Sequence, residues 1–160
     1  MTNTADRNNL DHPDVRIPPP LIYVAGFALG FMLEREFPVL VLPKTPSRVA
    51  ALLCVAAWAI LTAWSTGLFR GARTSMIPIK PTTALVVAGP YQFTRNPMYF
   101  GLICLYLGLA LWFGIFWALI LLPAVIAAVQ YYVIGREEQY LERKFGEEFL
   151  RYKARVRRWI

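Results

Sequence analysis

The side chains best suited to chemistry in this sequence lie in two short, well-separated stretches. The first, 89–99, reads Gly-Pro-Tyr-Gln-Phe-Thr-Arg-Asn-Pro-Met-Tyr, and the second, 136–138, reads Arg-Glu-Glu. Carboxylates and aromatic rings attract a cation, whereas the free N–H groups at the start of a helix attract an anion. Together the two stretches could hold a small molecule that carries both charges. A simpler interpretation is that the arginine and tyrosines anchor a helix at lipid headgroups and the Asn-Pro pair only begins it.

The pair Asn96-Pro97 marks the start of a helix. Asparagine is a favourable N-cap, and proline costs little at the first helical position because its missing N–H would have no partner there. We therefore expect a helix that begins at Pro97, just ahead of the longest apolar run. Its free N–H groups and the rings of Tyr91 and Tyr99 would then be available to the same ligand.

The rest of the sequence is typical of a membrane protein. Of its 160 residues, 57% are hydrophobic, the mean hydropathy is +0.43, and several long runs carry no charge. These values predict an all-α membrane protein whose partner is the lipid bilayer. The net charge of +7 fits membrane orientation, and we expect no nucleic acid partner because the basic residues do not belong to a soluble fold that could reach a groove.

Cysteine and histidine usage predicts chemistry without a metal. Cys54 and Cys104 both lie inside apolar runs, where a thiol behaves as a small hydrophobe and no disulfide framework is implied. His12 is the single histidine and stands in the polar leader with no cysteine near it. A zinc or iron site of the usual ligand types is therefore not expected.

The apolar runs predict about four transmembrane helices. The first two are expected at 21–33 and 49–69, and the segment 37–43, bracketed by prolines, suits an interfacial or re-entrant connection. The uncharged run 98–134 would be ~55 Å long as one helix, far more than the ~30 Å of hydrocarbon in a bilayer. It must fold back, and 112–114, Trp-Phe-Gly, is the expected tip of a helical hairpin.

The two ends of the chain are polar. Residues 1–16 are expected to be a disordered leader, which leaves 17–160 as a single membrane domain. From 136 to 159 apolar residues recur every three or four positions, which predicts an amphipathic helix that either lies on the membrane surface or covers a pocket. Gly146 weakens its middle and makes a break there plausible.

The distribution of basic residues predicts the orientation of the chain. Two lie in the leader, four in the loop 70–95 and eight in the tail, against three between the first two spans. With four spans, the three basic segments share one side. The positive-inside rule then predicts that both termini and the C-terminal amphipathic helix are cytoplasmic. The expected location of the protein is an inner membrane or endomembrane.

The two polar stretches also carry a family resemblance. The order Gly-Pro-Tyr, Arg-Asn-Pro-Met-Tyr and then Arg-Glu-Glu with Phe-Gly-Glu-Glu-Phe resembles the isoprenylcysteine carboxyl methyltransferases and the phospholipid methyltransferases. These are integral-membrane enzymes that use S-adenosylmethionine, and the resemblance covers 82–160. It implies an S-adenosylmethionine-dependent methyltransferase with a lipophilic methyl acceptor. The cofactor contacts that it implies are Thr83, Ala84, Leu85, Val86, Tyr91, Asn96, Pro97, Met98, Tyr99, Glu137 and Glu138.

This chain departs from the prenylcysteine pattern in two places. Asn96 stands where those enzymes have a histidine, and Val133 stands where they carry an arginine that holds the substrate carboxylate. Arg136 or Arg95 could substitute for that arginine, so Arg95, Asn96 and Arg136 are the residues expected to act in catalysis. The acceptor stays open between an isoprenylcysteine-like carboxylate and a phospholipid-like amine.

A second class of function is a small four-helix membrane transporter or a non-catalytic membrane subunit. A cation exporter would be expected to place a carboxylate inside a span, where an ionisable group is costly and therefore functional. None of the expected spans has one, and Glu34 lies at the end of the first. The sequence therefore favours the enzyme.

Overall fold

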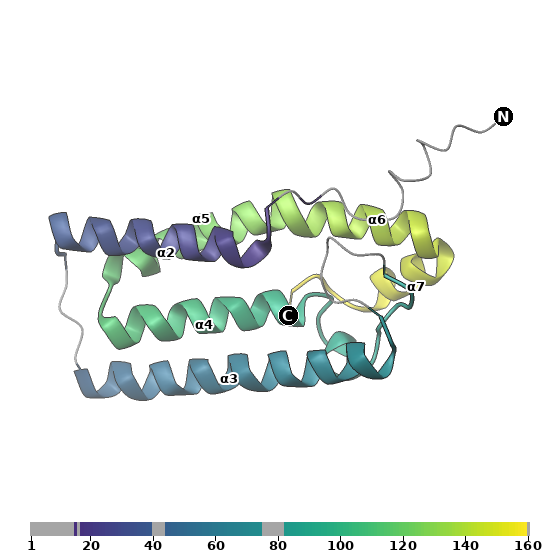
Figure 1. Cartoon of the computed structure of the whole chain (residues 1–160), viewed down its shortest axis with the longest axis horizontal. Coiled ribbons are helices and arrows are strands. Elements are labelled where there is room, and N and C mark those ends of the chain that lie inside the picture. The colour runs from purple at the N-terminus through teal and green to yellow at the C-terminus, as the bar shows by residue number, and fades with distance from the viewer. Residues whose placement is uncertain (1–14, 16, 40–43, 75–81, 160) are drawn as a thin grey trace.

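The computed structural model describes residues 15, 17–39, 44–74 and 82–159, and in these residues it is all-helical with no strand. The long helices lie side by side (Figure 1). They are α2 (Pro19–Glu36), α3 (Lys44–Gly71), α4 (Pro97–Phe113) and α5 (Phe116–Val129), the last of which continues through a π-helical turn, η2 (Gln130–Ile134), into α6 (Gly135–Phe145). Two short elements complete the described chain: the 3-10 helix η1 (Gly89–Gln92) and α7 (Glu147–Arg155).

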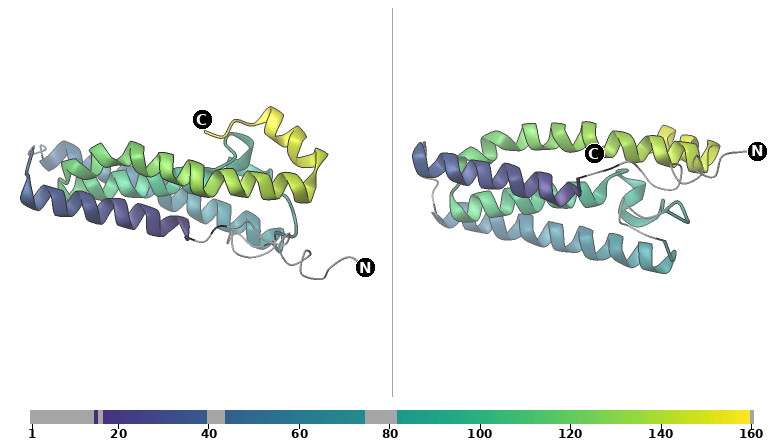
Figure 2. Two further views of the ribbon diagram at one scale, coloured as in Figure 1. Left: turned by 90° about the horizontal axis from the view of Figure 1, so that it is seen from above. Right: turned by 45° about the horizontal axis from the view of Figure 1, so that its top comes forward.

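Helices α4 and α5 form the predicted hairpin. Gly114 ends α4 in a left-handed conformation (φ 70°), which suits glycine, and the N–H of Ile115 donates to the carbonyl of Ala110. The expected tip at 112–114 is therefore confirmed. The start of α4 consequently faces the half of the bundle that contains α6 and α7 (Figures 1 and 2).

Close helix packing relies on small residues. A Cβ on Gly108 of α4 would lie 2.9 Å from a methyl group of Val55 on α3, and a Cβ on Gly30 of α2 would lie 2.7 Å from the Cα of Ala118 on α5. Contacts this short leave no room for a side chain. The small residues thus allow α3 to pack on α4 and α2 to pack on α5.

The outer surface of the bundle is apolar. Two helical stretches in the described chain, Ser47–Gly71 and Phe116–Phe145, are long and apolar enough to cross a membrane, and Pro97–Phe113 is apolar but shorter. Only 11% of the most apolar window of the first stretch is buried inside the structure, and Leu53 on it is 68% exposed. A core helix of a soluble protein would bury such residues, so lipid is their natural surrounding. The number of four spans and their orientation stay predictions.

Several boundaries differ from those expected. Helix α2 begins at Pro19, because two prolines fit its first turn, and α3 extends beyond 49–69 at both ends. The expected amphipathic helix over 136–159 is wrong as a single element. Its first part continues the preceding span, Gly146 (φ 53°) breaks it as anticipated, and the chain leaves α7 at Val156 in an extended conformation. Residues 1–14 and 16 of the expected leader, 40–43 of the proline-bracketed segment and 75–81 of the loop 70–95 lie outside the described residues.

Candidate active site

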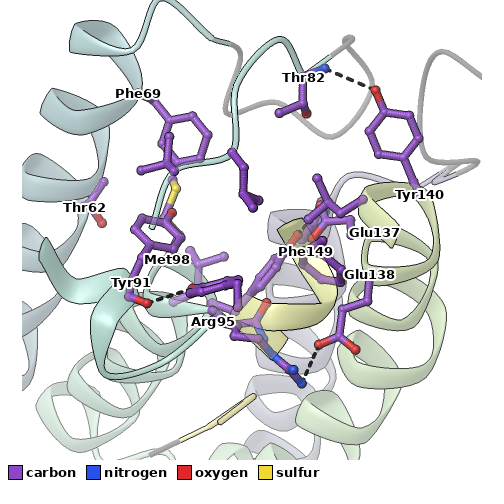
Figure 3. Close-up of a pocket in the computed structure, with 18 of the residues that line it drawn as sticks. Thr62, Phe69, Thr82, Tyr91, Arg95, Met98, Glu137, Glu138, Tyr140 and Phe149 are labelled. Atoms are coloured by element: carbon purple, nitrogen blue, oxygen red, sulfur yellow. Dashed lines mark hydrogen bonds and ion pairs between the residues drawn. The ribbon is translucent and has the colours of Figure 1, made fainter. Parts of the chain in front are cut away.

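A cavity of about 530 Å³ lies at the end of the bundle where α4 begins. Its walls come from the start of α2, from α3, from the loop before η1, and from α4, α6 and α7 (Figure 3). Of the residues predicted to form a site, the following line it: Ala84, Leu85, Val86, Tyr91, Arg95, Asn96, Met98, Tyr99, Glu137 and Glu138. Thr83, Pro97 and Arg136 do not line it, although their neighbours do.

A hydrogen bond between Tyr99 and Glu137 joins the two polar stretches across the cavity wall. The Tyr99 hydroxyl donates to Glu137 Oε1 over 2.7 Å, which connects the first turn of α4 to the first turn of α6. The hairpin therefore brings the two stretches together, as their positions at its two ends predict. Because Glu137 lines the cavity, its carboxyl group is within reach of a ligand that lies there.

Glu138, the next residue, takes part in a buried ion cluster. Arg95 NH2 lies 3.0 Å from Glu138 Oε1, and Arg158 donates from Nε to Oε1 over 3.1 Å and from NH2 to Oε2 over 2.5 Å. The hydrogen bonds to Glu138 raise the pKa of the Arg158 guanidinium. Arg95 also donates from NH1 to the carbonyl of Lys153 over 3.1 Å. Both terminal nitrogens of Arg95 thus have partners within the protein, whereas its buried Nε has none among the described residues.

Asn96 occupies the N-cap position of α4 without capping it through its side chain. The helix starts at Pro97 as predicted, and the Asn96 carbonyl accepts from the N–H of Phe100 over 3.0 Å. The side-chain Nδ2, however, donates to the carbonyl of Arg158 over 3.1 Å. Side-chain capping was therefore the wrong role for this amide, because the C-terminal residues offer it an acceptor that the local sequence does not reveal.

Aromatic residues form much of the remaining wall. The Tyr152 hydroxyl donates to the carbonyl of Tyr91 over 2.7 Å, and burial raises the pKa of both tyrosines, so both hydroxyls stay protonated. The Tyr140 hydroxyl accepts from the N–H of Thr82 over 3.2 Å and from Lys144 Nζ over 2.9 Å. These contacts hold the loop before η1 against α6 and α7 (Figure 3).

Sequence reasoning missed part of this wall. The apolar periodicity after residue 136 predicts an amphipathic face, and Phe149 and Tyr152 on that face do cover the cavity. Trp58, Thr62 and Phe69 of α3 had no such signal, because apolar residues on a transmembrane helix look alike in sequence whether they face lipid, protein or a cavity. Only the packing of α3 on α4 assigns them to the site.

Comparisons with known proteins agree with this arrangement. A family model described as phospholipid methyltransferase matches residues 46–148. A protein of Haemophilus influenzae, described as uncharacterized, is 43% identical over 63 residues, which cover 39% of this chain and 100% of that relative. No solved structure gives a significant match.

Proposed function

This chain belongs to the phospholipid methyltransferase family, and on that premise we propose that it is an integral-membrane enzyme that moves a methyl group from S-adenosylmethionine to a lipophilic acceptor. The Tyr99–Glu137 pair in the wall of the cavity is the observation that carries this proposal. The cavity volume of about 530 Å³ lies within the range of ~300–1,000 Å³ that is usual for small-molecule sites.

The lining residues fit the chemical groups of S-adenosylmethionine. Its ammonium and sulfonium groups are cations, for which the carboxylate of Glu137 and the ring of Tyr99 are suitable partners. Its carboxylate suits the free N–H groups of Met98 and Tyr99 in the first turn of α4. Its adenine suits the apolar and aromatic part of the wall, which includes Leu85 and Phe149.

When bound, S-adenosylmethionine supplies an electrophilic methyl group. Transfer in line to a nucleophile needs no covalent intermediate on the protein, so the chain's own residues act by positioning and by managing charge. Glu137 would attract the positively charged groups of the cofactor, and the hydrogen bond from Tyr99 fixes the direction of its carboxylate. The aromatic wall, with Tyr91, Phe149 and Tyr152, excludes water from the reacting groups.

The charges around the cavity favour an amine acceptor over a carboxylate acceptor. Among the described residues that line it, Arg95 is the only lysine or arginine, and it is paired with Glu138. Arg136, the other predicted partner for a substrate carboxylate, is exposed and lies outside the lining. An isoprenylcysteine-like carboxylate would therefore meet Glu137 without a free cation beside it, whereas a phospholipid-like amine would be attracted to it.

We further propose that the acceptor approaches sideways from the bilayer and that the cofactor arrives from the cytoplasm. The start of α2 contributes Pro18 to Pro20 to the lining, and α3 contributes Trp58, so an apolar wall adjoins the lipid-facing helices. In this orientation the protein lies in an inner membrane or endomembrane, and both of its termini face the cytoplasm.

The test has two steps. Detergent-purified protein is titrated with S-adenosylhomocysteine by calorimetry, and transfer of a labelled methyl group from S-adenosylmethionine into a total lipid extract is then followed. We expect saturable binding and labelling of an amine-bearing lipid. Binding without any labelled lipid would refute the lipid acceptor, and absence of binding would refute the cofactor and favour a non-catalytic membrane protein.

A further inference from the structure

The residues after α7 lie against the start of α4 and make specific hydrogen bonds with it. We call 156–159 the C-terminal strap. The carbonyl of Arg157 accepts from the N–H of Arg95 over 2.9 Å. The carbonyl of Arg158 accepts from Thr94 Oγ1 over 2.9 Å and from Asn96 Nδ2 over 3.1 Å. Three consecutive residues thus donate to two consecutive carbonyls, which fixes the turn that begins α4.

The side chains of the strap reach the other side of the site. Arg158 binds the Glu138 carboxylate of α6 with two nitrogens, and Trp159 Nε1 donates to Gln130 Oε1 on η2 over 2.8 Å. Neither Arg158 nor Trp159 lines the cavity. The strap therefore ties the start of α4 to α6 and η2 without touching the space where a ligand would lie.

Burial makes this link sensitive to the loss of either partner. The side chains of Arg95 and Glu138 are only 10% and 8% exposed. The side chain of Arg158 is 35% exposed. A buried carboxylate between two guanidinium groups depends on the charge and the hydrogen bonds of its partners, which water replaces only in part. If Arg158 is removed, Glu138 keeps Arg95 as a partner but loses two hydrogen-bond donors. We then expect its carboxylate to shift.

We propose that the strap positions the pair that faces the cavity, and that Arg158 is its main positioning residue. Glu138 directly follows Glu137, and Asn96 is three residues before Tyr99. Holding Glu138 and Asn96 against one strap therefore sets how Glu137 and Tyr99 meet across the wall. The proposal rests on the proposed function in so far as the ligand of this wall is S-adenosylmethionine.

The test uses residues that lie outside the cavity lining. Arg158→Met removes the double hydrogen bond to Glu138. Thr94→Val keeps the side-chain shape but removes the hydroxyl, which donates to the strap and also accepts from the N–H of Asn96 over 3.2 Å. Arg158→Lys restores the charge, and Arg155→Met, at an exposed residue three positions earlier at the end of α7, is the matched control. Affinity for S-adenosylhomocysteine is measured by calorimetry in detergent, well below the melting temperature of each variant. The KM for S-adenosylmethionine and kcat are measured alongside.

We expect Arg158→Met to weaken S-adenosylhomocysteine binding at least fivefold, with Arg158→Lys recovering part of the loss and Arg155→Met matching the parent. KM should rise more than kcat falls. In the double variant Arg158→Met with Thr94→Val, the fold-loss of affinity should be smaller than the product of the two separate losses, because both changes disturb contacts of the same strap. Lower melting temperatures with unchanged affinity in the folded variants would overturn the proposal and leave a purely structural strap, while the proposed function would stand.

A readout without ligand separates the two proposals. The amide of Arg95, which donates to the strap, should be protected from hydrogen exchange in the parent and should exchange faster in Arg158→Met. If the parent binds no S-adenosylhomocysteine, the proposed function fails, and this exchange measurement decides on the strap alone. Faster exchange would support the strap as the element that positions the turn, and unchanged exchange would overturn it.

Discussion

Replacement of Glu137 by glutamine is the most direct test of the site. Glutamine keeps the shape of the side chain and an oxygen that can accept from the Tyr99 hydroxyl, but it removes the negative charge from the cavity wall. Loss of a hydrogen bond to a charged group costs ~1.5–3 kcal/mol, which corresponds to a roughly tenfold to 150-fold weaker Kd. The melting temperature should stay close to that of the parent, because the neutral amide is easier to bury than the carboxylate.

The assay is calorimetric titration with S-adenosylhomocysteine, which shares the ammonium group of the cofactor. Glu142→Gln on the same helix is the matched control, because Glu142 pairs with Lys153 over 3.1 Å, is 42% exposed and does not line the cavity. That variant should bind like the parent. An affinity of Glu137→Gln equal to that of Glu142→Gln would refute the assignment, and the positive charge of the ligand would have to be held elsewhere.

Three further predictions concern the turn, the topology and the packing. Asn96→Asp replaces an amide donor by an acceptor that faces a carbonyl of the C-terminal strap, so it should melt at a lower temperature than Asn96→Ser; equal melting temperatures would contradict the contact. Single cysteines at Thr74 and Glu147, in a background without the native cysteines, should both react with an impermeant reagent from the cytoplasmic side, and reaction from opposite sides would exclude the proposed orientation. Gly30→Val should lower the free energy of unfolding by ~1–3 kcal/mol, measured by thermal unfolding, because its Cβ would lie 2.7 Å from the backbone of α5. Gly67→Ala should cause no such loss, because a Cβ at Gly67 has nothing within 4 Å.

The features that the sequence predicts well are those with a local cause or a length limit. The start of α4 at Pro97 follows from the conformation that an Asn-Pro pair favours. The hairpin follows from the length of an uncharged run that no bilayer could accommodate as one helix, and Gly114 supplies the left-handed residue that its tip requires. From the hairpin alone, the meeting of Tyr99 with Glu137 could be anticipated.

The features that it does not predict depend on partners far apart in the chain. The periodicity after residue 136 is that of one helix and gives no sign that the chain turns extended at Val156. It does so where the carbonyls of Arg157 and Arg158 gain donors from the turn before α4, and those donors lie more than fifty residues away in the sequence. For the same reason Arg158 could not be identified as the partner of Glu138, whereas Arg95 at least stood in a motif.

Helix geometry explains why three adjacent charged residues have three different surroundings. Successive residues on an α-helix are rotated by ~100°, so a cavity on one side of α6 can be faced fully by only one of Arg136, Glu137 and Glu138. Arg136 is exposed, Glu137 meets Tyr99 at the cavity, and Glu138 is directed to Arg95 and Arg158. Arg95 and Arg158 bring two guanidinium groups to the single carboxylate of Glu138. A zwitterionic ligand that places its cation at Glu137 can therefore place its anionic group on the α4 side, near the guanidinium groups around Glu138.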